Sequence, residues 1–123
     1  MPVIDCKNRA GLSLETKARL AEEITTEVRN VIKSPTDLIS VTFADLPAES
    51  TYRSGQSTDD TLIFCHIRKG RSDEAINRLL AAVSATWAKI TDTSEDNIEL
   101  LVAEYPAKFT LRGGVPLPEP PIV

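Results

Sequence analysis

The sequence has very little histidine and cysteine. Its 123 residues include one histidine, His66, and two cysteines, Cys6 and Cys65. Most zinc sites need several such ligands, and a Ser-His-Asp triad could be built only around His66. A core or interface histidine is the favoured interpretation of His66, and the two cysteines read as small core residues. We therefore expect no metal site.

Aromatic side chains, blocks of like charge and long apolar runs are also scarce. Aromatics make up 5% of the chain, and 14 Lys and Arg stand against 18 Asp and Glu, for a net charge of −4. These values argue against a nucleic-acid partner or an anionic membrane surface. No run approaches the ~20 apolar residues of a membrane-spanning helix. Two cysteines suit a reducing compartment, so a cytoplasmic protein is predicted. The length of the chain predicts one domain, residues 1–123.

The chain consists of two copies of one unit. Residues 3–48 align with residues 62–107 at a constant offset of 59, and thirteen of these 46 positions are identical. The gapless match indicates a duplicated half-domain, with units at 2–48 and 61–107. Residues 49–60 form a polar linker that is read as a loop or short hairpin. Residues 113–123 form a Pro-rich tail that is expected to be extended and to pack on a neighbouring subunit.

Each unit reads as strand, helix, strand. Strands are predicted at 3–7, 38–45, 61–67 and 98–104. Ser13 and Ser72 are good helix N-caps, and apolar residues follow each at three- and four-residue steps. Two such β-α-β units side by side give an α/β (α+β) fold, a four-stranded mixed sheet with two helices on one face.

The other face of this sheet has no predicted cover. Residues 62–65 and 100–103 are apolar at successive positions, which is typical of strands that are buried on both faces. We expect the open face to be buried against other subunits. The alternative is that the linker and the tail cover it.

Pro2 is the first candidate for chemistry. Removal of Met1 would leave Pro2 with a free secondary amine. The ordinary pKa of an α-amino group is about 7.7–8.0, and burial or nearby cations lower it. A neutral amine is a usable general base or nucleophile near pH 7. If Met1 is retained, Pro2 has no basic nitrogen and this mechanism fails.

Several segments together resemble the tautomerase superfamily, whose members include 4-oxalocrotonate tautomerase and macrophage migration inhibitory factor. The segments are Met1–Ile4, Val41–Ala48, Ile67–Ser72 and Glu104–Ala107. The pattern is most similar to the cis-3-chloroacrylic acid dehalogenase group. The resemblance runs from Pro2 to about Pro120 and implies a homotrimer without a cofactor, in which the N-terminal proline, here Pro2, moves the proton.

The resemblance also implies that Arg68 and Arg71 bind the carboxylate of a small-molecule substrate. The residues agree, because Arg forks bind carboxylates bidentately and a helix N-terminus favours an anion. The alternative is that Arg68 is a solvated residue that pairs with Asp73 or Glu74. In the repeat, Arg68 corresponds to Arg9, whereas Arg71 corresponds to Leu12.

The sequence departs from the dehalogenase group at three positions. The group has a histidine, a tyrosine and a glutamate where this chain has Val28, Leu101 and Arg112. None of these can activate water in the same way. Arg112 is read either as a third carboxylate contact or as a solvated residue, and Leu38 and Leu101 are expected to be apolar neighbours of the Pro2 amine.

We therefore predict a cofactor-independent keto–enol tautomerase of a small enol or 2-oxo carboxylic acid. One alternative is a hydratase, dehalogenase or decarboxylase that acts on a three-carbon acid. Others are a non-catalytic binding protein on this scaffold, and an unrelated ferredoxin-like ligand-binding domain.

Overall fold

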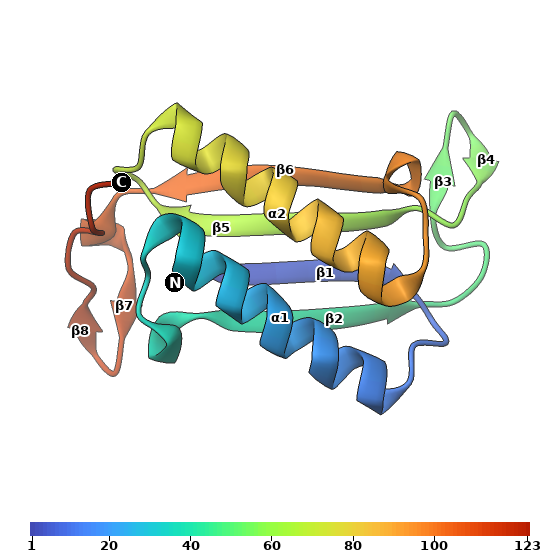
Figure 1. Ribbon diagram of the computed structural model, residues 1–123, viewed down its shortest axis with the longest axis horizontal. Coiled ribbons are helices and arrows are strands. Elements are labelled where there is room, and N and C mark those ends of the chain that lie inside the picture. The colour runs from blue at the N-terminus through green and yellow to red at the C-terminus, as the bar shows by residue number, and fades with distance from the viewer.

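The computed structural model describes all 123 residues and contains one four-stranded sheet with two helices on one face (Figure 1). The strand order is β2-β1-β5-β6, and the predicted mixed sheet is confirmed. The strands are β1 (Val3–Arg9), β2 (Ser40–Leu46), β5 (Thr61–Arg68) and β6 (Ile98–Tyr105). The outer pairs are parallel and the central pair, β1 with β5, is antiparallel.

The two helices are built alike. Helix α1 is Leu14–Ile32 and helix α2 is Asp73–Thr91. The hydroxyl groups of Ser13 and Ser72 accept from the backbone N–H three residues on, as expected for N-caps. Each helix ends on a left-handed residue, Lys33 at φ 57° and Asp92 at φ 53°, and these positions correspond in the repeat.

The strand register repeats with the sequence. Val3 lies opposite Ser40 in the first unit. The residues 59 positions later, Leu62 and Glu99, lie opposite each other in the second unit. In the central pair, Asp5 lies opposite Phe64, and this pair maps onto itself. A local two-fold axis therefore passes between β1 and β5 at this point. The end of the sheet that holds Pro2 is equivalent to the end that holds Thr61.

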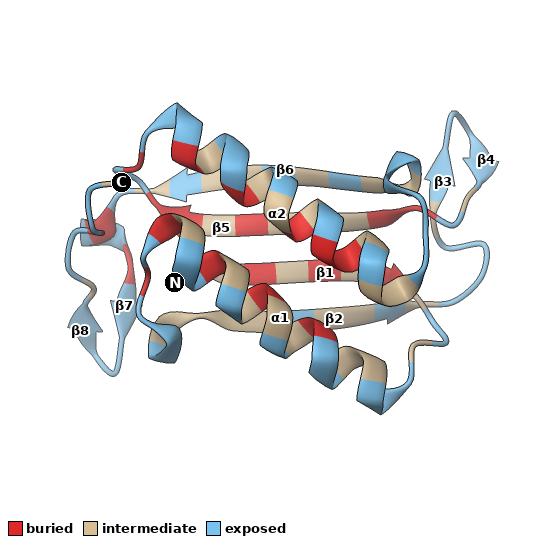
Figure 2. Ribbon diagram, viewed as in Figure 1, coloured by how far each residue is buried: buried red, intermediate tan, exposed pale blue.

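The core lies between the helices and the sheet (Figure 2). Alternate residues of β1 and β5 point into it, as the burial patterns of both strands show. Trp87 is 2% exposed and packs beside Phe43 at a ring distance of 6.1 Å. Cys6 and Cys65 are free and buried, as predicted, and burial raises the pKa of each thiol to about 12.

The second face of the sheet stays partly exposed. Leu62 and Phe64 are half-buried, and Leu101 is 38% exposed. The linker forms the hairpin β3 (Tyr52–Arg53) and β4 (Gln56–Ser57), and the tail region forms β7 (Leu111–Arg112) and β8 (Val115–Pro116). Figure 1 places these hairpins beyond opposite ends of the sheet. They do not cover its open face.

Short turns shift some predicted boundaries. A 3-10 turn, η1 (Thr36–Leu38), precedes β2, so this strand begins at Ser40, two residues later than predicted. The turns η2 (Glu95–Asn97) and η3 (Ala107–Phe109) flank β6. Neither helix is long and apolar enough to cross a membrane.

Candidate active site

Pro2 is buried where the chain enters β1. Its carbonyl accepts a hydrogen bond of 3.0 Å from the backbone N–H of Ser40. Leu38, half-buried, sits in the turn η1 that leads to Ser40. This arrangement fixes the Pro2 ring at the end of the central strand pair.

Met1 precedes this ring and lines a cavity of about 430 Å³, which we call the Met1 cavity. Arg112 and Tyr105 also line it, together with residues of β1, η3 and the tail hairpin. Burial lowers the pKa of the Met1 amine, and the positive charges of Arg68 and Arg112 lower it further. The electrostatic environment at this chain end therefore disfavours a protonated amine.

Arg68 and Arg71 are buried near this end of the sheet. Arg68, at the end of β5, is 1% exposed, and Arg71, in the loop before α2, is 6% exposed. Arg68 Nη1 donates to the carbonyl of Pro118 at 2.6 Å, and Arg71 Nη1 donates to the carbonyl of Arg68 at 2.9 Å. The Nε and Nη2 atoms of both side chains have no hydrogen-bond partner in the chain.

Neither guanidinium has an acidic partner. The ion pairs of the chain involve other residues. Burial, and secondarily the charge of Arg68, lowers the pKa of Arg71 to about 10. The alternative in which Arg68 is a solvated residue paired with Asp73 or Glu74 is wrong, because Arg68 is buried and forms no ion pair. Two buried cations without anionic partners are costly unless they serve a ligand.

The tail covers the loop that carries these arginines. Besides the Pro118 carbonyl on Arg68, the Val123 carbonyl accepts from the backbone N–H of Ser72 at 3.2 Å. Gly70 has φ 140°, and a Cβ there would lie 3.1 Å from Cγ of Pro120. The tail was expected to be extended and to pack on a neighbouring subunit. Here it packs on its own chain, and it competes for one nitrogen of Arg68.

One pair of side chains next to the cavity was not foreseen. His66 Nδ1 lies 2.9 Å from the Tyr105 hydroxyl. His66 is opposite Val3 in the central strand pair, and both Val3 and Tyr105 line the Met1 cavity. The sequence offered no signal for this contact, because the two residues are 39 positions apart on different strands.

The three positions that depart from the dehalogenase pattern fall in different places. Val28 is buried in the core on α1. Leu101 lies on the open face opposite Phe64 and does not line the Met1 cavity. Arg112 lines this cavity with its backbone in β7. Within one chain, Arg112 and Leu38 are therefore near the N-terminal end of β1, and Leu101 is not.

Comparison with known proteins identifies relatives over the whole chain. The family model described as "Putative oxalocrotonate tautomerase enzyme" matches residues 1–122. The crystal structure of N1, a member of the cis-3-chloroacrylic acid dehalogenase family, is 28% identical with a TM-score of 0.93, covering 97% of this chain and 85% of that one.

Two other solved structures share the fold. Pt0534 inactivated by 2-oxo-3-pentynoate is 26% identical with a TM-score of 0.88, over 94% of this chain and 96% of that one. The F6 fused 4-OT asymmetric trimer, 23% identical, has a TM-score of 0.89 over 94% of this chain and 95% of that one. No match to a curated protein was found.

Proposed function

Because the chain belongs to the oxalocrotonate tautomerase family, whose model spans residues 1–122, we propose that it is a cofactor-independent keto–enol tautomerase. Its substrate would be a small enol or 2-oxo carboxylic acid. One observation carries this proposal: Arg68 and Arg71 are buried close together with four unpartnered nitrogen atoms, and neither forms an ion pair. A carboxylate is the ligand that such a pair binds best.

Pro2 is the proposed acid and base. Removal of Met1 frees the Pro2 nitrogen and enlarges the cavity that Met1 now lines. The cations that lower the pKa of the Met1 amine would act on the Pro2 amine in the same way. The neutral amine takes the proton of the enol hydroxyl, the C=O bond forms, and the resulting ammonium returns the proton to the carbon atom. Protons and electrons balance without a further reactant.

The arginines hold the substrate while the proton moves. The carboxylate would lie against the free Nε and Nη2 atoms of Arg68 and Arg71, and their charge would stabilise the enolate that forms. Arg112, which lines the Met1 cavity, would add a third cation for an extended or dicarboxylic substrate.

Chemical labelling of the Pro2 nitrogen tests this mechanism. A 2-oxo-3-alkynoic acid such as 2-oxo-3-pentynoate is an electrophile, and a neutral amine adds across its activated triple bond without a leaving group. We expect one equivalent to bind the peptide that begins with Pro2, and activity on phenylenolpyruvate to fall in parallel. Intact mass must also show that the active protein lacks Met1. An active protein that retains Met1, or a label found elsewhere, refutes the role of Pro2.

A matched pair of variants separates the chemistry from binding. Pro2→Ala is expected to lower kcat by at least about 100-fold, because a general acid–base group contributes on that scale. Arg71→Met is expected mainly to raise KM and to slow labelling by the anionic reagent. A non-catalytic binding protein on this scaffold predicts no turnover in any of these forms.

A second candidate activity is hydration or dehalogenation of a three-carbon acid. The His66–Tyr105 contact of 2.9 Å beside the Met1 cavity favours it, because this pair could activate water where Val28, Leu101 and Arg112 cannot. Two results together would support this candidate. The protein would release halide from 3-haloacrylates, and Tyr105→Phe would lose this activity while it still tautomerises phenylenolpyruvate. Fast halide release relative to tautomerisation would displace our first choice.

The proposed assembly is a homotrimer in the cytoplasm. The partly exposed apolar face, with Leu62, Phe64 and Leu101, supports burial against neighbouring subunits, and such an assembly could bring Leu101 of one subunit towards Pro2 of another. Two free thiols suit a reducing compartment. Light scattering at several protein concentrations should give three times the mass of the chain, and a monomer would refute the assembly.

A further inference from the structure

The end of the sheet opposite Pro2 contains a second cavity. It has a volume of about 250 Å³ and lies where β1 ends and β5 begins, beside the C-terminal end of α2; we call it the Thr61 cavity. Thr61, Arg9 and Leu12 are among its lining residues. The offset of 59 relates these three to Pro2, Arg68 and Arg71 in that order. The cavity thus stands at the position that the local two-fold axis relates to the proline end.

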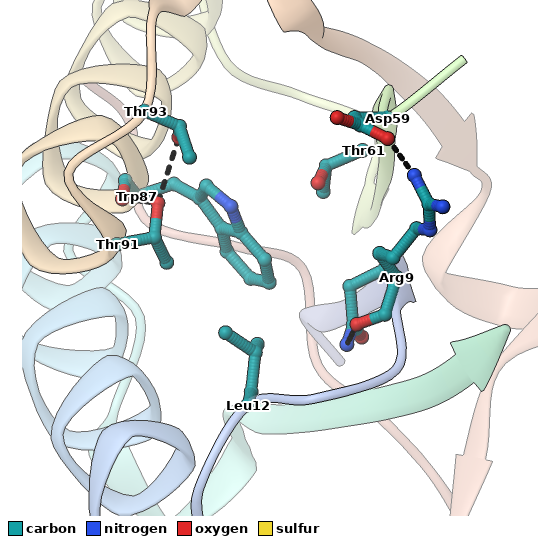
Figure 3. Close-up of a pocket in the computed structure, with 8 residues that line it drawn as sticks. Arg9, Leu12, Asp59, Thr61, Trp87, Thr91 and Thr93 are labelled. Atoms are coloured by element: carbon teal, nitrogen blue, oxygen red, sulfur yellow. Dashed lines mark hydrogen bonds and ion pairs between the residues drawn. The ribbon is translucent and has the colours of Figure 1, made fainter. Parts of the chain in front are cut away.

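The side chains that break the repeat change the chemistry of this cavity. Thr61 has no basic nitrogen, and Leu12 has no charge where the other end has Arg71. Arg9 forms an ion pair with Asp59 (Figure 3), which also lines the cavity. One cation and one anion cancel, so the lining is neutral. The proline end, by contrast, has Arg68 and Arg71 without acidic partners.

The walls favour a flat apolar molecule. Figure 3 shows the indole ring of Trp87 and the side chain of Leu12 facing the cavity from α2 and from the loop before α1. Aromatic rings pack well against such an indole face. A cavity of about 150 Å³ is enough to hold benzene, so about 250 Å³ leaves room for a ring with a small substituent.

Asn8 also lines the Thr61 cavity, and one of its polar atoms has no hydrogen-bond partner. Asn8 is 1% exposed, and its Nδ2 donates to the Arg9 carbonyl at 3.0 Å and to Asp45 Oδ1 at 2.9 Å. These two bonds fix the amide orientation, so that Oδ1 is left as an acceptor. Asn8 Oδ1 is buried and has no hydrogen-bond partner. Because a buried acceptor without a donor is costly, a ligand that donates one hydrogen bond would be favoured.

We propose that the Thr61 cavity is a second, non-catalytic binding site for small uncharged aromatic molecules that carry one hydrogen-bond donor, of which phenol is the simplest. The ring packs against Trp87 and Leu12, and the hydroxyl group donates to Asn8 Oδ1. Carboxylates are disfavoured, because the guanidinium of Arg9 is already paired and Leu12 supplies no charge. The site is independent of the chemistry at Pro2.

The single tryptophan of the chain reports on this site. Trp87 lines the Thr61 cavity and not the Met1 cavity. Titration with phenol, with excitation beyond the phenol absorption band, is expected to change Trp87 fluorescence saturably. Benzoate should bind at least about tenfold more weakly, since it gains no ion pair there. No saturable change with phenol, or equal binding of benzoate, overturns the proposal.

Two variants locate the ligand. Asn8→Leu should weaken phenol about tenfold and leave benzene unchanged, because only phenol loses a hydrogen bond. Because Asn8 also binds Asp45, a second variant is placed away from that contact. Leu12→Arg gives this end of the sheet an arginine pair like Arg68 and Arg71, and it should make the cavity prefer benzoate to phenol. The matched Leu12→Gln should keep the preference for phenol. If Leu12→Arg binds benzoate no better than the parent, the equivalence of the two ends does not extend to ligand binding and the proposal fails.

Discussion

Replacement of Arg71 by methionine should stabilise the fold while it impairs the enzyme. Arg71 is 6% exposed, has no anionic partner, and leaves its Nε and Nη2 atoms without hydrogen bonds. Burial and the charge of Arg68 lower its pKa to about 10, from an ordinary value of 12.5. The pKa of Arg71 is lower in the folded state than in the unfolded state, so burial of the charged side chain costs free energy. Because Arg71 is charged in both states at pH 7, the whole of this cost opposes folding.

The size of the effect follows from this difference. A pKa lowered to this extent corresponds to about 3 kcal/mol against the charged form. Methionine keeps most of the volume but loses the hydrogen bond from Nη1 to the Arg68 carbonyl, worth about 1 kcal/mol. The net gain is then about 2 kcal/mol, which raises Tm by about 8 °C for a chain of this length.

Urea denaturation at pH 7 and fixed protomer concentration measures this gain. We expect a higher midpoint with an unchanged slope, and a fall in kcat/KM on phenylenolpyruvate of about 100-fold from the lost charged hydrogen bonds. Arg78→Met, on the exposed side of α2, is the matched control and should change stability by less than about 0.5 kcal/mol. An Arg71→Met protein that is destabilised yet fully active would show that Arg71 is a structural residue, and the proposed carboxylate site would be refuted.

Four further outcomes follow from the same structure. Arg112→Ala removes a cation that lowers the pKa of the terminal amine, so the acidic limb of the kcat/KM–pH profile should move to higher pH; a shift to lower pH contradicts this. The thiols of Cys6 and Cys65, with pKa raised to about 12, should resist iodoacetamide at pH 8 until urea unfolds the chain, and labelling of native protein would count against their burial. Removal of residues 118–123 takes the Pro118 carbonyl from Arg68, so KM for a carboxylate substrate should fall several-fold, whereas a rise would mean that the tail helps to bind it. Ile24→Ala, at a fully buried position, should cost about 2–5 kcal/mol of unfolding free energy by calorimetry, and a cost below 1 kcal/mol would contradict the packing described.

Most of the fold could be predicted because each half of the repeat carries sequence signals that determine local structure. The N-cap residues Ser13 and Ser72 and the apolar spacing of the helices act within a few residues of themselves. The offset of 59 then requires that both halves share one topology, and the register of the strands confirms it. The start of β2 was misplaced because the turn η1 depends on a hydrogen bond from Leu38 N–H to Pro35, which the apolar pattern of the following strand hides.

The candidate site was predicted only in part, because its contacts join distant segments. The pattern around Arg68 and Arg71 pointed to a carboxylate site, and their burial without an ion pair agrees with that hypothesis. The cover from Pro118 involves a backbone carbonyl fifty positions away, and any residue can supply such a group. The contact of His66 with Tyr105 depends on strand register, which one sequence does not specify.

Because the offset of 59 maps the pair of Asp5 and Phe64 onto itself, the two ends of the sheet can be compared with each other within one chain. Backbone geometry, helix capping and strand register are shared by the two ends of the sheet, so none of them can explain a property that appears at one end only. Such a property must come from the side chains at which the halves differ, such as Pro2 against Thr61 and Arg71 against Leu12, or from the linker and the tail, which have no counterpart in the repeat. Exchanging these residues between the ends within a single molecule would separate what the scaffold contributes from what its side chains contribute.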